Sequence, residues 1–332
     1  MVSAPSLLLP SSVRGLASCA SDGAVRVACA TPSSTFTSSE ATSTSPSVLS
    51  VAVAYRATPR APATAPLLLR LTWSRSPLGP PTLSFAPSAS SPAVQLRRRR
   101  GTRFFPASDD GGGGSGGEQQ KRPQMALFWD LTAARYDATS PEPVGGFYVV
   151  AVAGSEVVLA VGELAAEFVK AKFEGQIPTA RVLPAARRDR VVVAAAEPGH
   201  PHRHRRRHPD APVHTARVRF AEGAPEHEVA VGCRAASGVG AGDEELWVSV
   251  DGKRAVHARR LRWNFRGNQT VFVDGAPVDV MWDLHGWWFR DPPGCAVVML
   301  RARSALESRL WLEEEAAAPG FSLVVQAFRT PP

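Results

Sequence analysis

Residues 246–289 constrain the fold more than any other part of the chain, because strands and turns can be assigned there from the residue pattern alone. Apolar residues alternate along 246–250, and the run stops at Asp251-Gly252. Asp-Gly readily adopts the positive φ angles of a tight hairpin turn. A second Asp-Gly pair lies at 274–275, again between two alternating runs. The segment therefore predicts an antiparallel meander.

The residues between these two turns are predicted to include a strand with one basic face. Leu261, Trp263 and Phe265 alternate with arginines and an asparagine, which is the period of two expected of a strand with one buried side. We expect the three apolar side chains to be buried and the arginines to be exposed. Gly267-Asn268 is predicted to turn the chain into the following strand.

Arg260, Arg262 and Arg266 would then form a row on the exposed face. Such a row could bind the phosphates of a nucleic acid or of anionic lipid headgroups. Alternatively, the same face could contact a protein partner, where arginine and tryptophan are frequent anchors. A third interpretation is that each arginine only pairs with an acidic residue on a neighbouring strand.

Several motifs of the chain fit a common pattern. Three lie in the meander: VSVDGKR, RLRWNFRGNQTVFVDGAPVDVMWD and the following His-x-Trp-Trp-Phe. Weaker matches lie at 71–79, 128–136, 146–152 and 321–328. Together they resemble a plant family known as domain of unknown function 868 (DUF868), over roughly residues 48–328. The resemblance implies a plant source and one β-rich domain, and it implies no activity because the family has none assigned.

The rest of the chain continues the pattern of short apolar runs separated by turn residues. We predict a single all-β domain over 48–328, an antiparallel β-sandwich or flattened barrel of about a dozen strands with at most one or two short helices. The one plausible helix is 164–173, where apolar residues repeat at helical spacing. No apolar run approaches the roughly 18 residues needed to cross a bilayer, so we expect no membrane span.

Two low-complexity stretches interrupt the strand pattern. The basic run 97–103 leads into a polyglycine run at 111–117, and we predict a long exposed loop there with disorder over 106–122. GHPHRHRRRHP at 199–209 lies in a second stretch predicted to be disordered, 196–212. Its histidines could bind a metal and its arginines a nucleic acid, but the interleaved cations and prolines favour a solvated insertion.

Residues 1–47 are rich in Ser and Thr and poor in acidic residues. This composition is typical of a disordered leader and also of an organellar transit peptide. We expect a disordered leader on a cytoplasmic or nuclear protein, with chloroplast import as the alternative.

Charge and cysteine content do not identify a ligand. The 38 basic and 30 acidic residues give a net charge of +8, and nearly all the basic residues are arginine. Arginine suits phosphate and carboxylate recognition, but GC-rich coding produces the same bias. The four cysteines lie far apart, without the close spacing of a zinc site. We therefore expect neither a metal nor a cofactor.

Asp283 and His285 are the best candidates for chemistry. Residues two apart on an extended chain project to the same side, so His285 could act as a general base oriented by Asp283 in a cofactor-free hydrolase. The alternative is that Asp283 fixes a turn while the neighbouring tryptophans fill the core. No nucleophile or phosphate-binding loop accompanies the pair. We therefore predict a non-enzymatic binding or protein-interaction module, with Asp283, His285, Trp287 and the three arginines as its candidate binding residues.

Overall fold

The computed structural model of the protein describes about two thirds of the chain, and it is dominated by strands. The described residues are 47–60, 65–75, 79–106, 124–138, 140–174, 176–193, 213–234, 244–290, 294–303 and 320–329. They form nineteen strands and two short helices, so the prediction of an all-β fold with at most two short helices is confirmed. The strand count exceeds the predicted dozen, and three of the strands are only two or three residues long.

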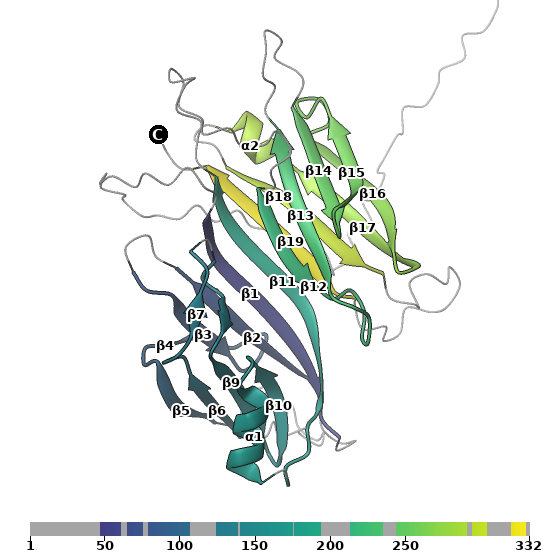
Figure 1. Ribbon diagram of the computed structural model, residues 1–332. Helices are drawn as coiled ribbons and strands as arrows, with labels where there is room; N and C mark the ends of the chain where they lie inside the picture. The colour runs from purple at the N-terminus through teal and green to yellow at the C-terminus, as the bar shows by residue number, and fades with distance from the viewer. Residues whose placement is uncertain are drawn as a thin grey trace, which may run out of the picture. The chain divides into compact units, whose positions relative to one another are not determined.

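One nine-stranded sheet organises the described chain (Figure 1). Its neighbours are antiparallel except β11 and β19, which pair in parallel. The sheet is open, with β16 and β4 at its edges. Its order is β16 (Arg266–Val273), β17 (Ala276–Asp283), β18 (Cys295–Ala302), β19 (Ser322–Arg329), β11 (Arg181–Val193), β1 (Ser47–Thr58), β2 (Leu67–Ser74), β3 (Thr82–Ala86) and β4 (Val94–Leu96).

Two four-stranded sheets accompany it. One has the order β10 (Glu156–Val161), β9 (Tyr148–Ala153), β6 (Met125–Asp130) and β5 (Arg100–Phe105). The other has the order β12 (His214–Val218), β13 (His227–Arg234), β14 (Glu245–Val250) and β15 (Lys253–Arg259). A small hairpin of β7 (Arg135–Tyr136) and β8 (Pro143–Gly145) and the helices α1 (Ala165–Phe173) and α2 (His285–Phe289) complete the structure.

The two four-stranded sheets pack on different parts of the long sheet. We call the layers β1–β4 and β5, β6, β9 and β10 the first sandwich, and the layers β16–β19 and β12–β15 the second sandwich. In the first, the rings of Trp73 and Phe147 meet at 5.5 Å between centroids, and those of Phe85 and Phe105 at 5.3 Å. In the second, the ring centroids of Phe220 and Phe321 lie 6.1 Å apart. Both sandwiches share one continuous cluster of buried apolar side chains.

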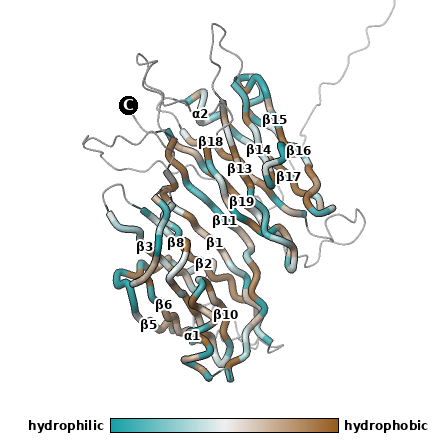
Figure 2. The backbone as a smooth tube through the Cα atoms, viewed as in Figure 1, coloured by the Kyte–Doolittle hydropathy of each residue, from teal (hydrophilic) through white to brown (hydrophobic). Residues whose placement is uncertain are grey.

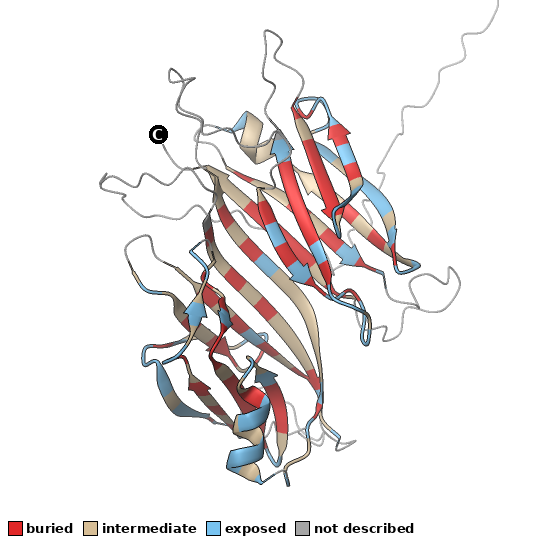
Figure 3. Cartoon of the chain, in the orientation of Figure 1, coloured by how far each residue is buried: buried red, intermediate tan, exposed pale blue. Residues whose placement is uncertain are grey.

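Strand alternation explains where this core forms. Along β2 every second residue is buried, and buried residues recur in the same way along other strands (Figure 3). Apolar residues follow the strands in the hydropathy view (Figure 2). Helix α1 begins within one residue of its predicted start and packs on the outer face of β9 and β6, where Phe168 stacks on Tyr148 at 4.2 Å. It therefore adds a small second core rather than a third layer.

Both predicted Asp-Gly turns are confirmed. Asp251 and Gly252 have φ angles of 50° and 75° between β14 and β15. Asp274 and its glycine have φ angles of 51° and 77° between β16 and β17. Positive φ at both central residues is the conformation that matches the twist of two adjoining strands.

The predicted strand through Leu261, Trp263 and Phe265 is wrong. Strand β15 ends at Arg259, and 261–263 form a turn in which the Asn264 N–H donates to the Arg260 carbonyl at 2.9 Å. Leu261 is fully buried, but the side chain of Trp263 is 82% exposed. An alternating face therefore does not exist in this segment.

Two further expectations are corrected. Gly267 and Asn268 lie inside β16 rather than in a turn, and glycine is required at 267 because a Cβ there would come within 2.2 Å of the Trp282 indole. The basic run 97–103 is not wholly loop, since Arg100–Phe105 forms β5 and pairs with β6. Residues 1–46, the glycine run at 111–117 and the His/Arg run at 199–209 lie outside the described residues.

Candidate functional site

The most distinctive hollow of the described structure is an apolar cavity inside the second sandwich. Its volume is about 410 Å³, and it is enclosed by β12, β13 and β14 on one side, by β18 and β19 on the other, and by α2. Its apolar walls combine short side chains with larger ones: Val213, Val231, Val298, Val325, Ala296 and Ala327 together with Leu246, Leu284, Trp287 and Trp288. Four polar side chains join them: His214, Cys233, Glu244 and Arg329.

Strand periodicity places these groups on the cavity wall. Val325, Ala327 and Arg329 are successive alternate residues of β19, so they share one face of the sheet. Val231 and Cys233 bear the same relation on β13. Alternate residues of each strand therefore face the cavity. Strands β13 and β19, which are distant in the sequence, form its facing walls.

Helix α2 closes one end of the cavity. Its first turn is held by Asp283, whose carboxylate accepts the backbone N–H of His285 at 2.9 Å. The N–H of Leu284 donates to the Phe265 carbonyl at 2.7 Å. These bonds fix the helix beside the sheet, so that Trp287 and Trp288 line the cavity.

Three charged groups gather near these tryptophans. The Arg329 guanidinium lies 4.5 Å from the ring centroid of Trp287 and 5.3 Å from that of Trp288. Arg262 lies over Trp288 at 5.6 Å and pairs with Glu244 at 3.3 Å. Desolvation lowers the pKa of Arg329 below its ordinary value. This end of the cavity therefore combines aromatic faces with a partly desolvated cation.

Two polar atoms at this end are buried without a hydrogen-bond partner among the described residues. They are Oε2 of Glu244 and Nε1 of Trp288. Buried polar atoms are nearly always hydrogen-bonded in folded proteins, so each exception calls for an explanation. Both residues line the cavity, so the Nε1–H of Trp288 is available to an acceptor on a bound molecule.

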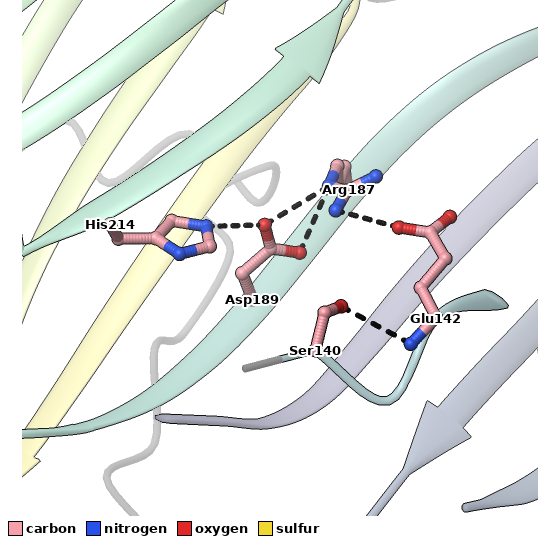
Figure 4. A network of polar contacts seen from close by, with 5 residues as sticks. All are labelled: Ser140, Glu142, Arg187, Asp189 and His214. Carbon is pink, nitrogen blue, oxygen red and sulfur yellow. Dashed lines mark hydrogen bonds and ion pairs between the residues drawn. The ribbon is translucent and has the colours of Figure 1, made fainter. Parts of the chain in front are cut away.

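A buried polar network supports another part of the wall (Figure 4). Arg187 of β11 pairs with Glu142 at 2.9 Å and with Asp189 at 3.0 Å, and the Nε2–H of His214 donates to Asp189 at 2.7 Å. Asp189 is fully buried. Desolvation lowers the pKa of Arg187, but the carboxylates of Asp189 and Glu142 outweigh it and raise that pKa above its ordinary value. The network fixes the imidazole of His214 at the cavity wall.

The chemistry of these groups favours binding over nucleophilic catalysis. An imidazole oriented by a carboxylate is the geometry of a general base. The same wall contains a side chain that could act as a nucleophile, the Cys233 thiol. Desolvation, and then the Glu244 carboxylate, raise the pKa of this thiol to about 11. Because the thiolate is the reactive form and the pKa of this thiol is raised, the thiol is mostly neutral at physiological pH, although the Cys233 residue itself is exposed to solvent.

The three predicted arginines do not form a row. Arg260 occupies a turn with a φ angle of 55°, Arg262 pairs with Glu244, and Arg266 pairs with Asp283 at 3.1 Å at the start of β16. The turn at 261–263 removes the shared face that a strand would have given them. Pairing with acidic residues, the third interpretation, describes Arg262 and Arg266.

The predicted pair of Asp283 and His285 is split between different roles. Asp283 binds the backbone of α2 and pairs with Arg266. The His285 ring contacts the rings of Phe265 and Phe289, at 5.7 and 5.4 Å between centroids. Neither side chain lines the cavity, and of the six candidate residues the cavity wall contains only Trp287.

Sequence reasoning missed the polar residues of the cavity. His214, Glu244 and Arg329 belong to three segments that no local motif connects. One signal was present: His214 precedes Ala216 and Val218 at alternate positions, and the burial pattern of β12 places all three on the inner face. An inward histidine in an alternating strand was therefore the available clue.

Among the described residues, no group of three or more His, Cys, Asp or Glu side chains is arranged to hold a metal ion. Neither described helix combines the length and the apolar character needed to pass through a bilayer.

Comparison with known proteins identifies a family. Residues 48–329 fit the model of a family described as plant protein of unknown function (DUF868). No curated protein and no solved structure matches the chain significantly.

Proposed function

The chain belongs to this plant family of unknown function, and we propose that it is a non-enzymatic binding module that holds a small apolar molecule inside the second sandwich. The observation that carries the proposal is the cavity of about 410 Å³ between the sheets and α2. Small-molecule sites commonly have volumes of about 300–1,000 Å³ and mostly apolar walls with a few polar groups. The cavity has this size and this lining.

A cavity of this size is unusual in a folded core. Protein interiors pack as densely as organic crystals, and voids much larger than a water molecule are few. Each unfilled volume costs stability, about 24 cal/mol per Å³ in one measured series of core substitutions. Short side chains such as Ala296 and Ala327 on the wall leave space that leucines would fill. Occupation by a ligand would recover the lost contacts.

Binding rather than catalysis agrees with the polar groups. The Cys233 thiol is neutral at physiological pH, and His214 is held by Asp189 in a network that also includes Arg187. These groups can orient a ligand through hydrogen bonds. A nucleophilic mechanism would require a second activating group next to the thiol.

The test is a fluorescence titration of the full chain with N-phenyl-1-naphthylamine, a neutral apolar probe that brightens in an apolar site. We expect saturable binding at about one probe per chain. Ala327→Leu places three additional carbons in the cavity and should abolish saturable binding. Ala160→Leu adds the same three carbons at an exposed position of β10, outside the cavity, and should leave binding unchanged.

Two results would reject the proposal. One is the absence of saturable binding by the folded protein. The other is equal binding by the wild-type chain and Ala327→Leu, which would place the probe elsewhere.

A further inference from the structure

Arg329 is the one charged group of the cavity wall for which the described residues provide neither a carboxylate nor a hydrogen-bond partner. Its described contacts are the faces of Trp287 and Trp288. Desolvation lowers its pKa, so the guanidinium has given up part of its hydration. A desolvated charge without a counter-ion is energetically costly.

The charges near Arg329 do not neutralise it. Glu244 pairs with Arg262 at 3.3 Å, so these two charges cancel. Cys233, whose pKa responds to both Glu244 and Arg329, carries no charge at neutral pH. Arg262, Glu244 and Arg329 together thus leave one net positive charge at this end of the cavity.

The stacking geometry leaves Arg329 able to bind an anion. A guanidinium that lies over an aromatic ring uses its face, whereas its five N–H donors lie in its own plane. Those donors match the two oxygens of a carboxylate as a fork. Trp288 supplies a further buried donor, Nε1–H, which has no acceptor among the described residues.

We propose that the ligand of the cavity is an apolar monocarboxylic acid whose carboxylate is bound by Arg329 and whose hydrocarbon body lies among the valines and alanines of β13, β18 and β19. The proposal rests on the proposed function and adds the chemical class of the ligand. Glu244 sets the limit of this class, because its buried carboxylate disfavours a second negative charge on the ligand. A dicarboxylate should therefore bind more weakly than a monocarboxylate.

The test uses three probes of equal chain length: decanoic acid, 1-decanol and decylamine. Each is titrated against the full chain loaded with N-phenyl-1-naphthylamine at neutral pH, and displacement of the probe is measured. We expect decanoate to bind about ten- to a hundredfold more tightly than decanol, since a charged hydrogen-bonding pair is worth about 1.5–3 kcal/mol. Decylamine should bind most weakly.

The variant Arg329→Gln tests whether the Arg329 side chain causes the preference for decanoate over decanol. This variant should bind decanoate and decanol with similar affinity, with little change for decanol. Arg329→Lys, which keeps the charge, should restore part of the preference for the acid. Arg254→Gln is the matched control, because Arg254 also stacks on a tryptophan, at 4.9 Å from Trp247, and lines no part of this cavity. A thermal melt of each variant checks that it is folded.

The outcomes separate the two proposals. If the naphthylamine probe does not bind saturably to the folded chain, the binding function itself is rejected. If the probe and decanol bind but decanoate gains nothing, or if decylamine binds most tightly, the function stands and the anionic class is overturned. Equal preference for decanoate in the wild-type chain and Arg329→Gln would also overturn it.

Discussion

The two sandwiches share one long sheet but differ in how the space between their layers is filled. The first is packed with large rings and leucines, among them Trp73, Phe85 and Leu127. The second has short side chains such as Val325 and Ala327 along the equivalent inner face, and it contains the cavity. The same layered architecture therefore carries large buried side chains in one half and a cavity in the other.

This difference shows that the strand arrangement does not decide whether a sandwich can bind a ligand. Layers about 10 Å apart enclose a fixed volume, and side-chain size determines how much of it remains open. In the second sandwich, Val and Ala side chains line part of the cavity. The tests below perturb matched positions in the two halves.

The largest effect is expected at Trp73. Trp73→Ala removes a side chain that is 2% exposed in the first sandwich, and it should lower the free energy of unfolding by about 3–5 kcal/mol. Val325→Ala on the cavity wall should cost only the transfer energy of two carbons, roughly 1.6 kcal/mol at 0.8 per methylene. Urea denaturation measures both, and equal losses would contradict the contrast between the halves.

The buried network between the sandwiches should be nearly as sensitive. Asp189→Ala leaves Arg187 with only the partly exposed Glu142 and removes the partner of His214, so we expect a loss of about 3–5 kcal/mol. Glu142→Gln is the matched change at the exposed end of the network and should cost about 1 kcal/mol. Similar losses for both, again in urea, would show that burial is not the deciding factor.

Enlarging a buried alanine should destabilise the first sandwich more than the second. Ala151 is fully buried within β9 of the first sandwich, and Ala151→Leu should overpack that core at a cost of about 1–3 kcal/mol. Ala327→Leu has the cavity to enter and should change the free energy of unfolding by less than about 0.5 kcal/mol. If Ala327→Leu lowers the free energy of unfolding more than Ala151→Leu, the cavity has no room for the added carbons and therefore none for a ligand.

A modest effect is expected at the contact that joins the two sheets of the second sandwich. His227 donates to Asp251 at 2.7 Å and to Asp274 at 2.9 Å, which lie in the two Asp-Gly turns. The bond to Asp251, and then that to Asp274, raise the pKa of His227 above its ordinary value in spite of burial. Because both carboxylates are about half exposed, we expect a contribution of about 1 kcal/mol.

The stabilisation from this contact should decrease as the pH rises. A histidine with a raised folded pKa contributes its full stabilisation below the unfolded pKa of about 6.5 and loses it as the pH rises through the folded value. Asp274→Asn should therefore lower the melting temperature most at pH values below 6.5, and its difference from the wild-type chain should shrink at higher pH. A constant difference across this range would mean that His227 is not charged in the folded protein.

The sequence predicted the turns of the meander better than its middle strand. Asp251-Gly252 was identified because few residues accept two successive positive φ angles, so the signal is local. Leu261 and Phe265 are four residues apart, and this spacing puts them on one side under a strand period of two and nearly so under a helical period of 3.6. Trp263 distinguishes the two, and its exposure shows that the turn is correct.

The candidate site was less accessible to sequence reasoning than the fold. The parallel pairing of β11 with β19 joins residues such as Ala186 and Ser322, and no local pattern specifies it. His214 and Arg329 share the cavity wall only through such long-range pairings. Asp283 and His285, by contrast, were conspicuous because they are neighbours in the chain, and their roles are local as well.

The most direct test of the ligand-binding account is a crystal structure of the full chain with 10-bromodecanoic acid, recorded at the bromine absorption edge. We predict one anomalous peak inside the second sandwich, between β13 and β19, with the carboxylate on the guanidinium of Arg329 and the cavity walls otherwise unchanged. An empty cavity in crystals grown at saturating ligand, or bromine bound only at the protein surface, would contradict it.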